Sequence, residues 1–179
     1  MIVKLARSIV ESPLDDPLVA SFFSPHHTSQ CSQACYECLQ RYGNRSYHGL
    51  LDWRLGISML RVFLDRTWIA GLDGNWSKAP ETVGWLDTAM GCAGAIVSLS
   101  PDRQELSEIG PLKLPTILQR KARRRFVLVH PFWSRDAVLP LVDDGFDGAT
   151  LFIDTFQAER RPQRVLAAAV EYAKLRGFM

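Results

Sequence analysis

Three of the four cysteines in this chain lie close together, at Cys31, Cys35 and Cys38. Zinc prefers thiolate and imidazole ligands in a tetrahedron, and a Cys-x-x-Cys pair such as Cys35 and Cys38 can place two sulfur atoms on one ion. Cys31 can reach the same ion if the chain turns between Cys31 and Cys35. The pattern therefore predicts a structural zinc site near residue 35.

The spacing does not fix the fourth ligand of this site. The candidates are His26, His27, His48 and Cys92. Cys92 lies in an apolar stretch, where a free cysteine is more typical of a small buried hydrophobic residue. We favour His27, so that the predicted ligands are Cys31, Cys35, Cys38 and His27.

Two other interpretations of the cysteine cluster stay open at this point. The three residues can be reduced, half-buried cysteines on a short helix without a metal. They can also form a redox pair, but a thioredoxin-type Cys-x-x-Cys follows a strand, and here a polar loop at 24–30 precedes it. A disulfide framework is not expected, because the chain is cysteine-poor and the charges of Lys4 and Arg7 argue against a secretory signal.

A dense basic run is the second chemical feature of the sequence. It comprises Arg120, Lys121, Arg123, Arg124 and Arg125. Such a run can bind nucleic-acid phosphates with a salt-sensitive affinity that does not depend on base sequence. The alternative is a solvated loop that only keeps the chain soluble. We predict that these five residues contribute to DNA binding.

A possible reaction centre lies at the ends of two predicted strands, at His130 and Asp154. A His/Asp pair can do general acid–base work, and Asp154 with Glu159 can hold a divalent ion. This constellation gives the alternative function, a small metal-dependent nuclease-like enzyme. A histidine that ends a buried strand and bonds to backbone is the commoner arrangement, so we expect no catalytic residues.

The elements that must position these residues fall into two predicted lobes. Residues 1–70 form a helical lobe with the cysteine cluster, including a helix that starts at Asp52. A turn-rich stretch at 71–75 separates it from an α/β lobe at 75–179. That lobe has buried strands at 126–130 and 149–153 and a closing helix after Pro162.

Two segments of the second predicted lobe are less regular. Residues 112–118 contain Pro115 and are predicted to be at most an edge strand. Residues 93–99 can be a strand or the end of a buried helix. The predicted fold class is α/β, with α+β as the other option: a small helical zinc lobe followed by a small sheet lobe.

Composition bounds the class of protein. The chain has 179 residues, 47% of them hydrophobic and 22% charged, with a formal net charge of +2. These values are typical of a soluble globular protein and exclude wholesale disorder. No uninterrupted apolar run approaches the roughly 18 residues that span a bilayer. We therefore expect a cytoplasmic protein without a membrane partner.

The cysteine segment also resembles a known family. The residues that carry the resemblance are Cys35-Tyr36-Glu37-Cys38-Leu39, Tyr42, Asn44, His48 and Leu51-Asp52. Together they resemble the cysteine-rich C-terminal zinc-binding module of MrfA-type DEAD/DEAH helicases and of helicase-linked proteins in the DISARM and Druantia phage-defence systems. The resemblance covers about residues 31–64. The family uses four cysteines for zinc, whereas only three map onto it here, and Trp53 stands where the family has an arginine.

The resemblance implies a function as well as a metal. It implies a zinc-binding, helicase-associated module that binds DNA or docks a DEAD/DEAH-type helicase or another defence-system subunit, in anti-phage defence or DNA repair. The sequence carries no Gly-x-x-x-x-Gly-Lys-Ser/Thr loop for nucleotide phosphates. We therefore expect an accessory module that depends on another chain for ATP hydrolysis.

Overall fold

The structure is a computed structural model that describes residues 2–99 and 104–177. These residues form two compact units, and the chain passes between the units more than once. The first unit contains residues 2–71 and 75–83, and the second contains 72–74 and the described residues from 84 onward. The turn-rich stretch at 71–75 is therefore where the chain first leaves the first unit, but residues 75–83 return to it.

The first unit is helical. Its elements are α1 (Ile2–Glu11), η1 (Ala20–Phe23), α2 (Pro25–Gln30), η2 (Tyr42–Leu50), α3 (Trp53–Leu64), η3 (Trp76–Lys78) and η4 (Pro80–Thr82). Helix α3 begins where the Asp52 side chain accepts a hydrogen bond from the Leu55 N–H at 3.0 Å, a standard helix cap. An ion pair between Arg61 on α3 and the buried carboxylate of Glu81 ties residues 75–83 to this unit.

The second unit is a layer of helices on a sheet. Its elements are α4 (Trp85–Leu99), β1 (Glu105–Ile109), β2 (Leu114–Gln119), η5 (Arg120–Ala122), β3 (Arg124–Val129), α5 (Arg135–Val138), η6 (Leu139–Leu141), β4 (Ala149–Asp154), α6 (Thr155–Arg160) and α7 (Pro162–Leu175). The strand order is β1-β2-β3-β4, antiparallel except for the parallel pair β3–β4. The prediction of an α/β fold with a small sheet is confirmed.

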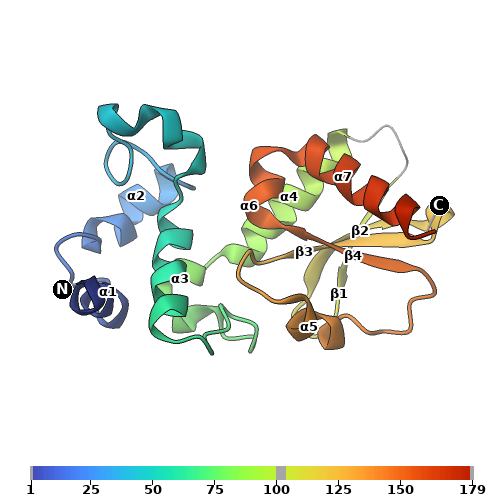
Figure 1. Ribbon diagram of the computed structural model, residues 1–179, viewed down its shortest axis with the longest axis horizontal. Coiled ribbons are helices and arrows are strands. Elements are labelled where there is room, and N and C mark those ends of the chain that lie inside the picture. Colours follow the sequence, from blue (N-terminus) through green and yellow to red (C-terminus); the bar gives the residue numbers. More distant parts are fainter. Residues whose placement is uncertain (1, 100–103, 178–179) are drawn as a thin grey trace. The chain divides into compact units, whose positions relative to one another are not determined.

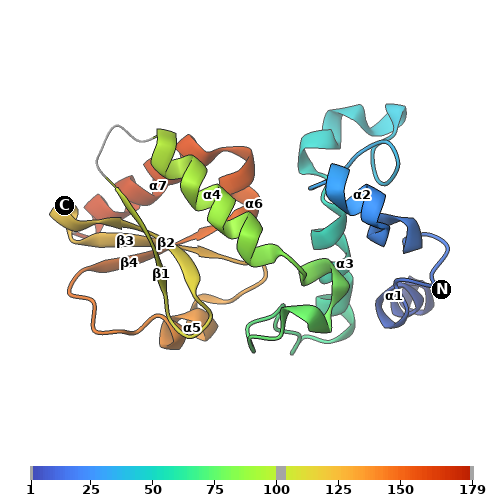
Figure 2. The ribbon, with the colours of Figure 1, turned by 180° about the vertical axis from the view of Figure 1, so that it is seen from behind.

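Helices α4, α6 and α7 cover one face of this sheet (Figures 1 and 2). The segment Pro80–Leu99 is long and apolar enough, by length and composition only, to cross a membrane. The core helix of a soluble protein passes the same test, and here Gly84, with φ +78°, interrupts the segment before α4 begins. Helix α4 then packs on β2 and β3, with Ala89 and Ala93 fully buried.

Two local expectations for the second unit are revised by the structure. Residues 93–99, left open between strand and helix, belong to α4. The predicted edge strand at 112–118 is instead β2, an inner strand between β1 and β3. Pro115 is tolerated because the pairing of β2 with β3 starts only at Thr116. The missing N–H of proline therefore removes no hydrogen bond between these two strands.

Candidate metal centre

His27 is placed by the start of α2. The Ser24 side chain caps the helix by accepting a hydrogen bond from the His27 N–H at 3.2 Å, and Pro25 fits the first helical turn. The His27 ring is buried, and its Nδ1 lies 2.8 Å from the Phe22 carbonyl oxygen. A carbonyl can only accept, so Nδ1 carries the proton and donates it, which leaves Nε2 with a free lone pair.

The three cysteines lie near His27 Nε2, at the end of α2 and in the turn that follows it. Cys31 ends the helix, and the chain then turns at Cys35, whose carbonyl accepts from the Cys38 N–H at 3.2 Å. The Cys35 N–H donates back to the Cys38 sulfur at 3.1 Å. The four ligand atoms, one each from His27, Cys31, Cys35 and Cys38, all lie within 4.8 Å of one another.

The separations match those expected for one tetrahedral ion. Zinc–sulfur bonds of about 2.3 Å and zinc–nitrogen bonds of about 2.0 Å put two thiolates about 3.8 Å apart, and a thiolate and an imidazole nitrogen about 3.5 Å apart. The Cys31–Cys38 and Cys35–Cys38 sulfur pairs are 3.8 Å and 3.9 Å apart, and Cys35 Sγ lies 3.5 Å from His27 Nε2. A disulfide needs about 2.05 Å between sulfurs. The donor set and its geometry therefore fit a metal ion.

The cysteine thiols differ in how their surroundings shift their pKa values. Burial, with the nearby Cys35 and Cys38 thiols, raises the pKa of Cys31 to about 12. Burial works against ionisation at Cys35 as well, but hydrogen bonds from the Glu37 backbone and the neighbouring thiols lower the pKa of Cys35 below its usual value. Crowded buried thiolates repel one another, and a divalent cation among them would compensate that charge.

A network of polar residues, including Asn44 and His48 of the family pattern, supports the cysteine turn. Asn44 Nδ2 donates to the Leu39 carbonyl, and the Asn44 Oδ1 accepts from the Arg41 N–H at 2.7 Å. His48 Nε2 lies 2.9 Å from Asn44 Oδ1. Arg54 donates to the Cys31 and Ser32 carbonyls, which joins α3 to the cysteine turn. These polar residues hold the turn and are not needed as ligands.

The other candidates for the fourth ligand have different positions. His26 is exposed, and His48 bonds to Asn44 as described. Cys92 is buried on α4 in the other unit, where burial, with a smaller effect of Glu159, raises its pKa to about 11. Within residues 2–99 and 104–177, the His27 cluster is the one group of three or more His, Cys, Asp or Glu ligand atoms that meets so closely.

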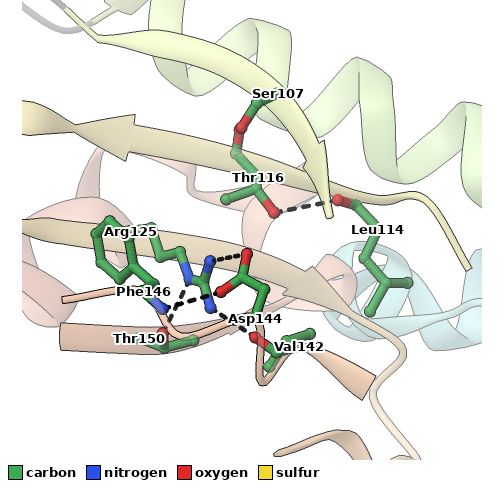
Figure 3. Close-up of polar contacts among 8 residues, drawn as sticks. All are labelled: Ser107, Leu114, Thr116, Arg125, Val142, Asp144, Phe146 and Thr150. Carbon is green, nitrogen blue, oxygen red and sulfur yellow. Dashed lines mark hydrogen bonds and ion pairs between the residues drawn. The ribbon is translucent and has the colours of Figure 1, made fainter. Parts of the chain in front are cut away.

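The basic run is divided by the sheet, contrary to the predicted surface. β3 starts at Arg124, and Arg124 and Arg125 are both buried, with exposures of 8% and 4%. Figure 3 shows the Arg125 side chain reaching the Thr150 hydroxyl, the Asp144 carboxylate and the Val142 carbonyl, at 2.9, 2.8 and 2.6 Å. Arg124 donates to the Gln119 side chain. These two arginines stabilise the fold and are removed from the predicted DNA-binding set.

The remaining three basic residues of the run are exposed. Arg120 forms a double hydrogen bond with Glu105, at 2.9 and 2.8 Å, and Arg123 pairs with Asp147. Arg123 also takes a left-handed backbone conformation, with φ +46°, to turn the chain from η5 into β3. Any phosphate contact by this run therefore falls to Arg120, Lys121 and Arg123 alone.

His130 and Asp154 have structural roles at the carboxyl ends of β3 and β4. His130 is buried, and its Nδ1 accepts a hydrogen bond from the Phe132 N–H at 3.2 Å. Asp154 caps α6, its Oδ1 accepting from the Gln157 N–H at 2.9 Å. Glu159 lies beside Arg160 at 3.9 Å. None of the three belongs to the close group of metal-ligating atoms found among the described residues, and the alternative function stays a prediction.

The burial of His130 predicts a pH dependence of stability. Burial lowers its pKa from 6.5 to about 4. Between these two pH values the unfolded chain binds a proton at His130 that the folded chain does not bind. Stability from this group is present above pH 6.5 and is lost as the pH falls toward 4. We expect the second unit to lose about 2 kcal/mol between pH 7 and pH 5 relative to His130→Gln. Urea denaturation of both proteins at several pH values measures this, and parallel pH profiles would contradict it.

No known protein family, characterised protein or solved structure matches this chain. The family resemblance therefore depends on the residues of the cysteine segment alone.

Proposed function

We propose that this protein is a non-catalytic, zinc-binding accessory module that acts in the cytoplasm with a DEAD/DEAH-type helicase or another subunit of an anti-phage or DNA-repair system. The single observation that carries the proposal is the meeting of His27 with the three cysteines. The likeness of the cysteine segment to helicase-associated modules supports the choice of partner. Soft thiolates with one imidazole favour zinc over magnesium or calcium.

The metal would act on folding and would not take part in a reaction. Four protein ligands complete a tetrahedron, and a catalytic zinc site keeps one position open for water or substrate. His27, Cys31, Cys35 and Cys38 would hold the ion, and the Phe22 carbonyl would orient the histidine. The module would thus present fixed surfaces to its partners, and docking of protein is better supported than DNA binding since Arg124 and Arg125 are buried.

The metal content of the purified chain tests this proposal. We expect close to one equivalent of zinc per chain by mass spectrometry of the metal, and its loss in Cys35→Ser. Cys92→Ser is the control, because Cys92 is also a free cysteine but lies outside the cluster. Wild-type protein that folds without bound metal, or a Cys35→Ser variant that keeps a full equivalent, would contradict the proposal.

A further inference from the structure

A groove of about 620 Å³ follows β4 in the second unit. Five consecutive residues of the strand, 150–154, line it, together with one face of α7 and Arg135 at the start of α5. β4 is an end strand, since it pairs with β3 on one side and closes the strand order on the other. The groove therefore runs along the open edge of the sheet.

The backbone of β4 presents hydrogen-bonding groups to this groove. The Ala149 N–H donates to the Arg123 carbonyl at 2.9 Å, which directs the polar groups of Ala149 toward β3. In a parallel ladder these directions alternate along the strand, so the N–H and C=O groups of Thr150 and Phe152 point to the open edge. Such an edge is a template for a further strand.

The walls of the groove are apolar. Leu151 and Phe152 of β4 are half-buried, and Val165, Ala168 and Tyr172 of α7 face the groove at helical spacing. An added strand places alternate side chains toward such walls, and these side chains would bury apolar surface there.

The rim of the groove is positively charged. Arg135, Arg161 and Arg164 line it and are exposed, and none of them forms an ion pair within the part of the chain that the structure describes. The one lining carboxylate, Asp154, is engaged as the cap of α6. Arginine prefers carboxylates and phosphates, so the rim selects an anionic ligand.

We propose that this groove binds an extended acidic peptide segment of a partner protein, which pairs with β4 as a fifth strand and places its carboxylates against Arg135, Arg161 and Arg164. The proposal deepens the docking function proposed above and rests on it for the idea that the chain acts through a partner. A second copy of the chain is disfavoured, because it would bring the same arginines against themselves. Nucleic acid would satisfy the arginines but neither the strand edge nor the apolar walls.

A labelled short peptide of alternating valine and glutamate, measured by fluorescence anisotropy with the full chain, tests the groove. We expect salt-dependent binding that Arg161→Glu with Arg164→Glu weakens at least about tenfold, since reversed rim charges repel the peptide. Lys174→Glu is the matched control on α7, as Lys174 is exposed and does not line the groove. Arg135→Glu, from a different element, should also weaken binding.

Altered peptides separate the components of recognition. Methylation of alternate backbone nitrogens should remove most of the affinity by blocking strand pairing, and a valine–lysine peptide should not bind. Equal binding of all peptides, no binding of the acidic one, or wild-type affinity in the arginine variants would overturn the proposal. Tighter, arginine-dependent binding of oligo-dT, or dimers that the arginine variants abolish, would assign the groove to nucleic acid or to a second copy instead.

Failure of this proposal can be told apart from failure of the proposed metal site. The groove lies in the second unit and the cysteine cluster in the first, so Cys35→Ser should lose zinc and keep its affinity for the peptide. Peptide binding by a chain that never holds zinc would support the groove proposal and contradict the metal site. Zinc binding without peptide binding would support the metal site and contradict the groove proposal.

Discussion

Removing the proposed zinc ion is expected to unfold the first unit and leave the second folded. The buried cluster at the centre of the first unit comprises Ile9, Val19, Phe22, Cys31, Cys38, Trp53 and Ile57, so two of its seven members are proposed ligands. Structural zinc contributes on the order of 10 kcal/mol in small zinc-finger peptides, more than the roughly 5 kcal/mol by which many small domains are stable. We expect that a strong zinc chelator, or Cys38→Ser, removes the amide protection of α3 in hydrogen exchange.

The second unit supplies the internal reference for this experiment. Amides of β3, the inner strand whose residues are all buried, should keep their protection after chelation. Addition of zinc to the chelated wild type should restore α3, and it should not restore Cys38→Ser. Equal protection of α3 with and without metal would show that the apolar cluster is sufficient by itself.

Arg125→Ala is expected to cost the second unit about 3 kcal/mol, because it removes a large buried side chain together with its hydrogen bonds. Only the arginine of its ion pair with Asp144 is buried, since the Asp144 side chain is 48% exposed. Arg125 is 4% exposed, and its guanidinium bonds to Thr150, Asp144 and Val142 and lies over the Phe146 ring, 4.5 Å from the ring centre. The substitution leaves the Val142 carbonyl without this donor and opens a cavity beneath the loop. Chemical denaturation followed by tryptophan fluorescence measures the loss.

Arg123→Ala is the matched control for this variant. Arg123 lies two residues away in the same basic run, and its pair with Asp147 is solvent-exposed. Exposed ion pairs contribute about 0–1 kcal/mol, and alanine meets the same positive φ as arginine, so the backbone strain is unchanged. Similar costs for the two variants would mean that burial does not distinguish the two arginines.

The sequence predicted those features that depend on residue type and short spacing. Cys31, Cys35 and Cys38 lie within eight residues, and His27 precedes them by four, so a turn is enough to gather them. The α/β class followed from apolar strands alternating with helices. That the site binds a metal, and that this metal is zinc, both stay predictions.

Features that depend on which strands become neighbours could not be predicted. The burial of Arg124 and Arg125 follows from the position of β3 inside the sheet and from the loop that covers Arg125. By charge alone the two residues look the same as Arg123. The groove along β4 likewise needs the strand order, and Pro115 misled the strand assignment because its effect depends on where the β2–β3 pairing begins.

The return of residues 75–83 to the first unit affects how the chain can be recombined in evolution or cut in the laboratory. A fragment that ends at residue 71 would contain Arg61 without the Glu81 carboxylate that neutralises it. Neither unit is therefore encoded by one continuous stretch of sequence. Recombination within the 71–83 stretch would damage both parts at once. The two units are therefore expected to be transmitted together, and a protease cut at residue 73 should leave Glu81 and Arg61 on separate polypeptides still joined by their ion pair.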